Sequence, residues 1–82
     1  MRQIEFSDHA LNQMRERDIS REFIKETINH PDKIISQSQR TKALKFFANK
    51  DKEYLYVVIY ENTAGISKVI TAFITSKIKK YF

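Results

Sequence analysis

The sequence predicts a small α+β domain in which two N-terminal helices pack on an antiparallel sheet of four strands. Two early segments follow a serine and carry apolar residues at helical spacing, and the only proline comes directly after them. The remainder of the chain is rich in β-branched and aromatic residues, which favour strands. With 82 residues the chain has room for one hydrophobic core, so we expect a single domain over residues 1–82.

The helices are expected at residues 8–17 and 21–28. Ser7 and Ser20 precede them and can act as N-caps, because a serine hydroxyl accepts a hydrogen bond from a free N–H of the first turn. Pro31 ends the second helix, since proline supplies no N–H and disfavours helical geometry in the residue before it. Residues 1–6 suit a brief strand or an extended lead-in and are not counted among the four strands.

The four strands are expected at residues 33–38, 41–48, 54–60 and 66–75. Residues 62–65 form a hairpin loop that contains the only glycine. Strict alternation along the last strand places Val69 and Phe73 on one face and Ile70 and Ile74 on the other. Ser76 can cap a short C-terminal helix or tail over residues 77–82. The two N-terminal helices should cover one face of the sheet and leave the other free for a ligand.

The positive charge of the chain is concentrated in its second part. The net charge is +5, to which residues 1–33 contribute −1 and residues 34–82 contribute +6. This distribution suggests that the sheet and the C-terminal tail face a polyanion, although lysines can also protect sheet edges from aggregation. The chain has no cysteine and two histidines, too few ligands for a structural zinc site, and we expect neither a metal nor another cofactor. Residues 55–60, the longest apolar stretch, cannot span a membrane, so a soluble, cytoplasmic protein is expected.

Candidate catalytic residues lie in the first predicted helix. His9 begins that helix, and Gln13 and Arg17 follow at intervals of four residues along one polar stripe. A histidine can exchange a proton near neutral pH, which suits general acid–base catalysis on a phosphodiester. The alternative is a histidine hydrogen-bonded near a helix start for structural reasons.

Basic and aromatic residues of the predicted strands could bind a nucleic acid. Arg40, Lys42 and Lys45 can bind phosphate oxygens and neutralise developing charge, although alternation places Lys42 and Lys45 on opposite faces. Each of these could instead be a solvated surface charge. The tyrosines of the third strand share one face, where they could stack on bases or form cross-strand pairs in the core; they are Tyr54, Tyr56 and Tyr60.

The stretch Phe6–Leu11, followed by Met14, Arg17 and Ile19, resembles the signature H-A-x-x-R-M-x-x-R-x-I of the small domains called domain of unknown function 4258. The spacing to residues 29–32 and to the strands around 56–58 and 69–73 also fits. These domains resemble the RelE and ParE toxins, which implies a RelE-like fold with an RNA-cleaving site on the open side of the sheet. In this correspondence His9 and Arg17 match signature residues, whereas Gln13 stands at the position of the first signature arginine.

The resemblance implies a toxin of a toxin–antitoxin pair, a metal-independent endoribonuclease that cleaves mRNA, including ribosome-bound mRNA, or tRNA. A ribose 2′-hydroxyl would attack the adjacent phosphate, and an acidic antitoxin would cover the basic face. The roles implied are general acid or base for His9, phosphate binding for Arg17 and Arg40, charge compensation for Lys45 and backbone positioning for Thr71.

Two other functions remain open at this point. The first is a non-catalytic RNA-binding or protein-binding module of the same fold, which Gln13 favours because one expected cation is missing. The second is a ParE-like toxin that acts on a topoisomerase by protein contact and has no nuclease activity.

Overall fold

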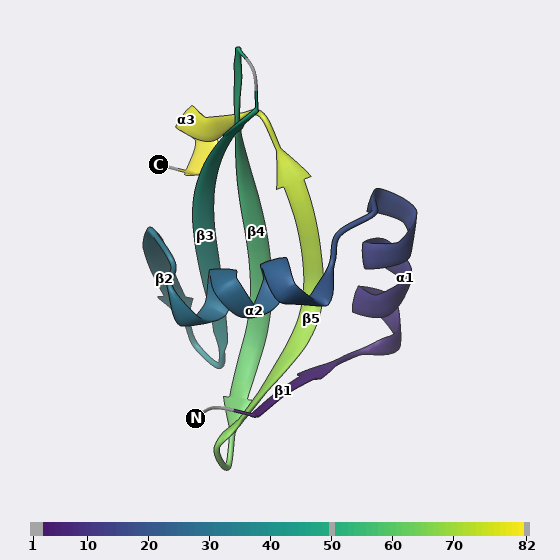
Figure 1. Cartoon of the computed structure of the whole chain (residues 1–82). Coiled ribbons are helices and arrows are strands. Elements are labelled where there is room, and N and C mark those ends of the chain that lie inside the picture. The colour runs from purple at the N-terminus through teal and green to yellow at the C-terminus, as the bar shows by residue number, and fades with distance from the viewer. Residues whose placement is uncertain (1–2, 50, 82) are drawn as a thin grey trace.

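The computed structural model describes residues 3–49 and 51–81 (Figure 1). More than half of these residues are in strands. The elements in chain order are β1 (Gln3–Phe6), α1 (Asp8–Arg17), α2 (Arg21–Asn29), β2 (Lys33–Gln37), β3 (Arg40–Asn49), β4 (Lys52–Thr63), β5 (Ile66–Thr75) and α3 (Ile78–Tyr81).

The sheet has five strands and is mixed, so the predicted four-stranded antiparallel sheet was wrong. The strand order is β1-β5-β4-β3-β2, and β1 pairs with β5 in parallel, with Gln3 opposite Ile66 and Phe6 opposite Val69. The prediction failed because β1 has four residues and its partner lies more than sixty positions later. A pairing at that separation leaves no local pattern in the sequence.

The two N-caps predicted from the serines are confirmed. The Ser7 hydroxyl accepts a hydrogen bond from Ala10 N at 3.0 Å, and the Ser20 hydroxyl accepts one from Phe23 N at 3.2 Å. Asp18 ends α1 in a left-handed conformation with φ 55°, and α2 ends at Asn29, before Pro31. The local sequence therefore fixes where both helices begin and end.

The two longer helices lie in different places relative to the sheet. Figure 1 shows α2 crossing one face of the sheet in front of the central strands, while α1 lies beside β5. We call the side covered by α2 the helix face and the opposite side the open face. The main core lies on the helix face, where Met14 of α1 and Ile24 and Ile28 of α2 pack with strand residues such as Tyr56 and Tyr60.

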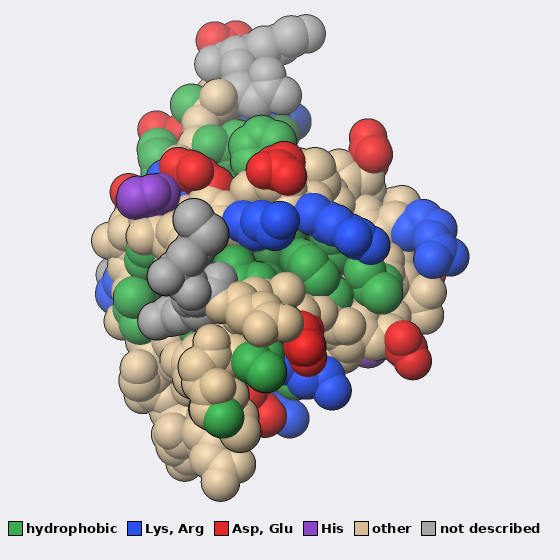
Figure 2. Space-filling view, turned by 60° about the horizontal axis from the view of Figure 1, so that its bottom comes forward, with side chains coloured by type: hydrophobic (Ala, Val, Ile, Leu, Met, Phe, Trp, Pro, Cys, Tyr) green, Lys and Arg blue, Asp and Glu red, His purple; other side chains and the backbone are tan. Residues whose placement is uncertain are grey.

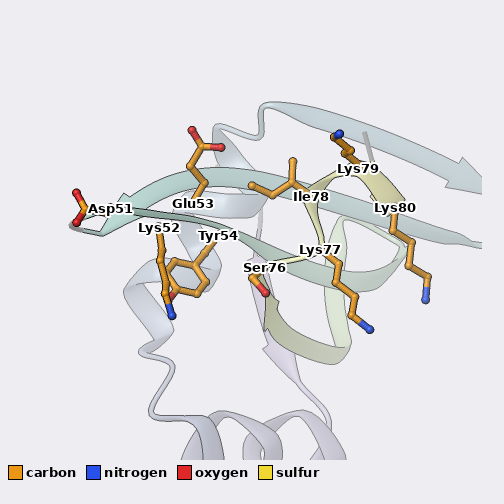
Figure 3. Close-up of a pocket in the computed structure, with 9 residues that line it drawn as sticks. All are labelled: Asp51, Lys52, Glu53, Tyr54, Ser76, Lys77, Ile78, Lys79 and Lys80. Atoms are coloured by element: carbon orange, nitrogen blue, oxygen red, sulfur yellow. The ribbon is translucent and has the colours of Figure 1, made fainter.

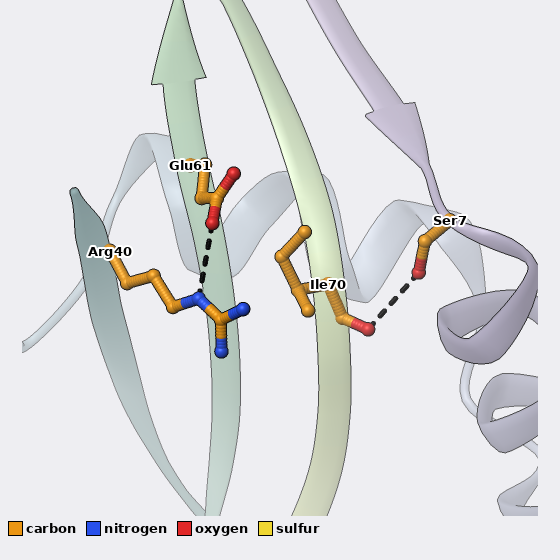
Figure 4. A network of polar contacts seen from close by, with 4 residues as sticks. All are labelled: Ser7, Arg40, Glu61 and Ile70. Atoms are coloured by element: carbon orange, nitrogen blue, oxygen red, sulfur yellow. Dashed lines mark hydrogen bonds and ion pairs between the residues drawn. The ribbon is translucent and has the colours of Figure 1, made fainter.

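Side chains in and next to α1 form hydrogen bonds with the part of β5 that is not paired with β1. The Ser7 hydroxyl donates to the carbonyl oxygen of Ile70 at 3.1 Å (Figure 4). The Gln13 side-chain oxygen accepts hydrogen bonds from the Thr71 hydroxyl and from Ala72 N, the latter at 3.1 Å. Backbone groups that a longer β1 would have paired are thus paired with side chains.

A second apolar cluster lies on the open face. Leu44, Leu55 and Val57 are fully buried there, and Ile78 of α3 packs against them together with Phe73 and other partly buried residues. The β4–β5 register shifts between Ile59 and Tyr60, which indicates a β-bulge. Because of this shift, Val69 packs on the helix face and Phe73 on the open face, so the strict alternation predicted for this strand was wrong.

Candidate nucleic-acid interface

The two candidate catalytic residues of α1 stand at opposite ends of the helix. His9 is exposed in the first turn and Arg17 is exposed in the last. Eight residues at 1.5 Å each separate them by about 12 Å along the helix axis. The two side chains are therefore poorly placed to act on the same phosphate.

Lys45 and Thr71 take part in contacts within the fold. The Lys45 ammonium donates to the carbonyl oxygen of His30 at 3.0 Å, at the C-terminal end of α2. Lys45 lies opposite Tyr56 and so shares the helix face with it. The Thr71 hydroxyl donates to Gln13 and joins β5 to α1.

Arg40 lies at the start of β3 on the open face. Its guanidinium Nε is 3.1 Å from a carboxylate oxygen of Glu61, and the two side chains are 61% and 33% exposed (Figure 4). Lys45 occupies the other face of the same strand, and both candidates of α1 lie beyond β5. The structure therefore does not bring the five predicted residues, His9, Arg17, Arg40, Lys45 and Thr71, into one site.

Three cations do share the open face at the β2–β3 side of the sheet. Arg40 and Lys42 lie four and two positions before Leu44 in β3, so they share its face. Leu44 belongs to the open-face cluster. Lys33 of β2 lies opposite Leu44 and so faces the same way. Sequence alternation groups Arg40 with Lys42, but only the strand pairing adds Lys33 to them.

The lysines around α3 form a second basic region. Lys77, Lys79 and Lys80 surround Ile78, which packs on the open face. Together with Lys52, and with acidic residues of the β3–β4 hairpin, they line an open depression of about 800 Å³. Figure 3 shows that Lys77 and Lys80 extend toward one side, whereas Lys79 points away from them. The name basic rim is used below for six residues: Lys33, Arg40, Lys42, Lys77, Lys79 and Lys80.

The two longer helices, α1 and α2, do not contribute to the excess of positive charge. α1 and α2 together contain four acidic and four basic side chains. Some of these cations pack on apolar side chains, as the Arg21 guanidinium does 5.7 Å from the centre of the Phe6 ring. Figure 2 shows basic side chains lying over hydrophobic ones, with acidic side chains close by. A polyanion should therefore prefer the basic rim to the helices.

Phe46 is the aromatic residue on the open face that sequence reasoning missed. It lies opposite Leu55 of the open-face cluster, and it is 40% exposed. Its position two residues after Leu44 in β3 is the signal that could have placed it on the same face as Arg40 and Lys42. An exposed ring at this point can stack on an unpaired base.

The tyrosines proposed for base stacking belong to the helix face. Tyr56 and Tyr60 are buried, and the Phe47 ring stacks on Tyr56 at 4.5 Å and on Tyr54 at 5.4 Å between ring centres. Phe23 of α2 stacks on Tyr56 at 5.0 Å. Burial raises the pKa of the Tyr56 hydroxyl above its ordinary value. Packing within the fold, the alternative weighed for these residues, is what the structure shows.

Neither a cluster of metal ligands nor a membrane-spanning helix occurs in the part of the chain that the structure describes. Among residues 3–49 and 51–81, no three histidine, cysteine, aspartate or glutamate side chains come together as metal ligands would. Within the same ranges, every helix is too short or too polar to cross a membrane.

Comparison with known families identifies the family of this chain. The family model described as Domain of unknown function (DUF4258) matches residues 6–74, which run from the last residue of β1 almost to the end of β5 and include both longer helices. Comparison with curated proteins and with solved structures gave no match.

Proposed function

We propose that this chain, which belongs to the DUF4258 family, is a binding domain for single-stranded RNA that uses the open face of its sheet. The observation that carries the proposal is that the basic rim shares the open face with the exposed ring of Phe46. Lysine and arginine side chains bind the phosphate backbone, and an aromatic ring on a sheet can stack on a base. RNA is our choice of polyanion because the RelE-like ribonucleases, to which the sequence signature implies a relation, act on RNA.

The spread of the cations favours binding over cleavage as the first candidate. A catalytic site for a phosphodiester needs an acid–base group and cations that meet at one phosphate. In this protein Lys79 points away from Lys77 and Lys80, and the candidates of α1 lie on another side of the molecule, beyond β5. A row of separated charges suits an extended strand, whose successive phosphates are themselves separated.

The salt dependence of RNA affinity tests this proposal. Fluorescence anisotropy with a labelled 20-nucleotide single strand would compare wild type with the double variant Arg40→Ala, Lys42→Ala at several salt concentrations. For single strands, each lost phosphate contact reduces the slope of log affinity against log salt by about 0.7, so a reduction of about 1.4 is expected. The matched control is Arg15→Ala, Arg17→Ala, which removes two exposed cations of α1. Equal losses in both double variants would contradict the proposed face.

A second candidate is a toxin-type endoribonuclease, and one observation favours it. The Glu61 carboxylate lies between Arg40, at 3.1 Å, and Lys68, its partner in the β4–β5 register. A carboxylate can accept the proton of a ribose 2′-hydroxyl as it attacks the adjacent phosphate. The neighbouring cations would offset the negative charge that develops on the phosphate oxygens. Glu61 would then take the role that the sequence assigned to His9.

Cleavage is tested by following total RNA after induced expression in a bacterial host. Fragmentation that Glu61→Gln abolishes and His9→Ala preserves would support a site on the open face. The opposite pattern, with loss in His9→Ala and Arg17→Ala, would place the site on α1. Growth arrest with intact RNA would instead support the ParE-like mode of action. A toxin of either kind would require an acidic antitoxin as its partner.

A further inference from the structure

The outer edge of β2 carries an unpaired row of backbone groups. β2 is the last strand of the sheet, and Figure 1 shows no described segment beyond it. Residues 38–39 form a two-residue turn, which makes Gln37 and Arg40 a hydrogen-bonded pair in a tight hairpin. Because such pairs alternate along an antiparallel ladder, the N–H and C=O groups of Ile34 and Ser36 point away from β3.

An apolar side chain lies on the same edge. Ile34 is 51% exposed, which makes it the most exposed of the three large hydrophobic residues in the described chain that are at least 40% exposed. It is paired with Ala43 of the helix face, whereas Lys33 and Ile35 on either side of it face the open side. An added strand would thus meet an apolar contact on one side and the positive charge of Lys33, with Lys42 one strand further, on the other.

The free edge of β2 ends at Lys33, the first residue of the strand. β3 continues past Leu44, which lies opposite Lys33, and there the carboxylate of Asp32 accepts a hydrogen bond from Phe46 N at 2.7 Å. The adjoining Asp32 N donates to the carbonyl oxygen of Leu44 at 2.8 Å. These contacts occupy the backbone of β3 next to β2. A strand that joins the sheet here would therefore pair along Lys33–Gln37.

We propose that β2 accepts an extended, acidic segment of a partner protein as a sixth strand of the sheet. Main-chain hydrogen bonds to Ile34 and Ser36 would give affinity, as in other cases of strand addition. Alternate side chains of the segment would be apolar toward Ile34 and acidic toward Lys33, because opposite charges on facing strand positions stabilise a pair. A second copy of this chain fits less well, since it would bring a second set of Lys33, Arg40 and Lys42 to the same junction. This inference does not depend on RNA binding.

The probe is the blocked peptide Glu-Val-Glu-Val-Glu-Val-Glu, which places acidic side chains on one face of a strand and apolar ones on the other. Its binding to the full chain would be followed by amide chemical shifts in ¹⁵N–¹H spectra and by calorimetry. The largest shifts are expected at Ile34 and Ser36. The charge-reversed peptide, with lysine in place of glutamate, should bind at least about tenfold more weakly.

Two variants of β2 and one control test the location. Ser36→Pro removes an N–H that points outward and makes no hydrogen bond to β3. Ile34→Asp adds a negative charge that repels the probe. Each should weaken binding about tenfold or more. Phe23→Asp is the matched control, because Phe23 is 49% exposed but lies on α2. Circular dichroism identifies any variant that fails to fold, in which case the other variant decides.

Three results would overturn the proposal. The first is a set of amide shifts that leaves β2 unchanged. The second is equal binding of the acidic and basic peptides, which would remove the charge argument. The third is a dimer of the peptide-free protein in sedimentation that Ser36→Pro dissociates, because a second copy would then be the occupant of this edge.

Discussion

Replacing Gln13 by arginine restores the arginine expected in the family signature, and we predict that it destabilises the fold. The Gln13 side-chain oxygen accepts hydrogen bonds from the Thr71 hydroxyl and from Ala72 N. Arginine has five donors and no acceptor, so Gln13→Arg removes both bonds. The residue that departs from the signature is therefore one on which the α1–β5 contact depends.

The size of the effect follows from the burial of the groups left behind. Ala72 is 1% exposed, so its N–H would lose its partner in a place that water scarcely reaches. An unsatisfied buried donor costs about 1–3 kcal/mol, and the lost hydroxyl bond adds about 0.5–1.5 kcal/mol. We expect the free energy of unfolding to fall by about 2–3 kcal/mol, which for a chain of this size lowers the Tm by about 8–24 °C.

Urea unfolding followed by circular dichroism measures this difference. Gln13→Glu keeps an acceptor at the same position and should lose less stability than Gln13→Arg. Asn12→Arg is the matched control, because Asn12 is the exposed neighbour on the same helix, and it should change the free energy of unfolding by less than about 0.5 kcal/mol. If Gln13→Arg were as stable as Asn12→Arg, the hydrogen bonds to β5 would not contribute as we argue.

Three further predictions concern the turn, the buried tyrosine and the first helix cap. Ala64 has φ 51° ahead of Gly65 at φ 80°, so Ala64→Asn should raise stability by about 0.5–1 kcal/mol in thermal unfolding, and a lower Tm would refute this. Burial raises the Tyr56 pKa above 10.0, so stability should fall as pH rises above about 10, where the unfolded state releases the proton more readily. Tyr56→Phe should weaken that alkaline loss in urea titrations at pH 9–11, and an unchanged loss would argue against it. Ser7→Ala removes the bonds to Ala10 N and Ile70 O and should cost about 1–2 kcal/mol in urea unfolding, whereas no loss would mean that neither contact matters.

Local signals accounted for the parts of the fold that were predicted correctly. The range of α1 and the range of β5 follow from Ser7, from helical spacing and from the glycine turn at Gly65. Each of these features lies within a few residues of the boundary that it sets. The N-cap hydrogen bonds of Ser7 and Ser20 show the chemistry on which those predictions rested.

The features that were missed depend on contacts between distant parts of the chain. Nothing near Gln3–Phe6 indicates that these residues pair with β5. The bulge beside Ile59 changes which residues of β5 face the helices, and a strict period of two cannot show it. Lys33 shares the face of Arg40 and Lys42 only through the β2–β3 pairing, which places it opposite Leu44. Alternation within one strand thus separated Lys42 from Lys45, but the sequence could not show which cations of different strands share a face.

The central claim is that RNA binds the open face, and an NMR titration tests it most directly. Adding a 20-nucleotide single-stranded RNA to ¹⁵N-labelled protein should shift the amides of Lys33, Arg40, Lys42 and Phe46 and those of α3, and leave most of α1 unchanged. Shifts confined to α1 and α2, or none at RNA concentrations well above that of the protein, would contradict the claim.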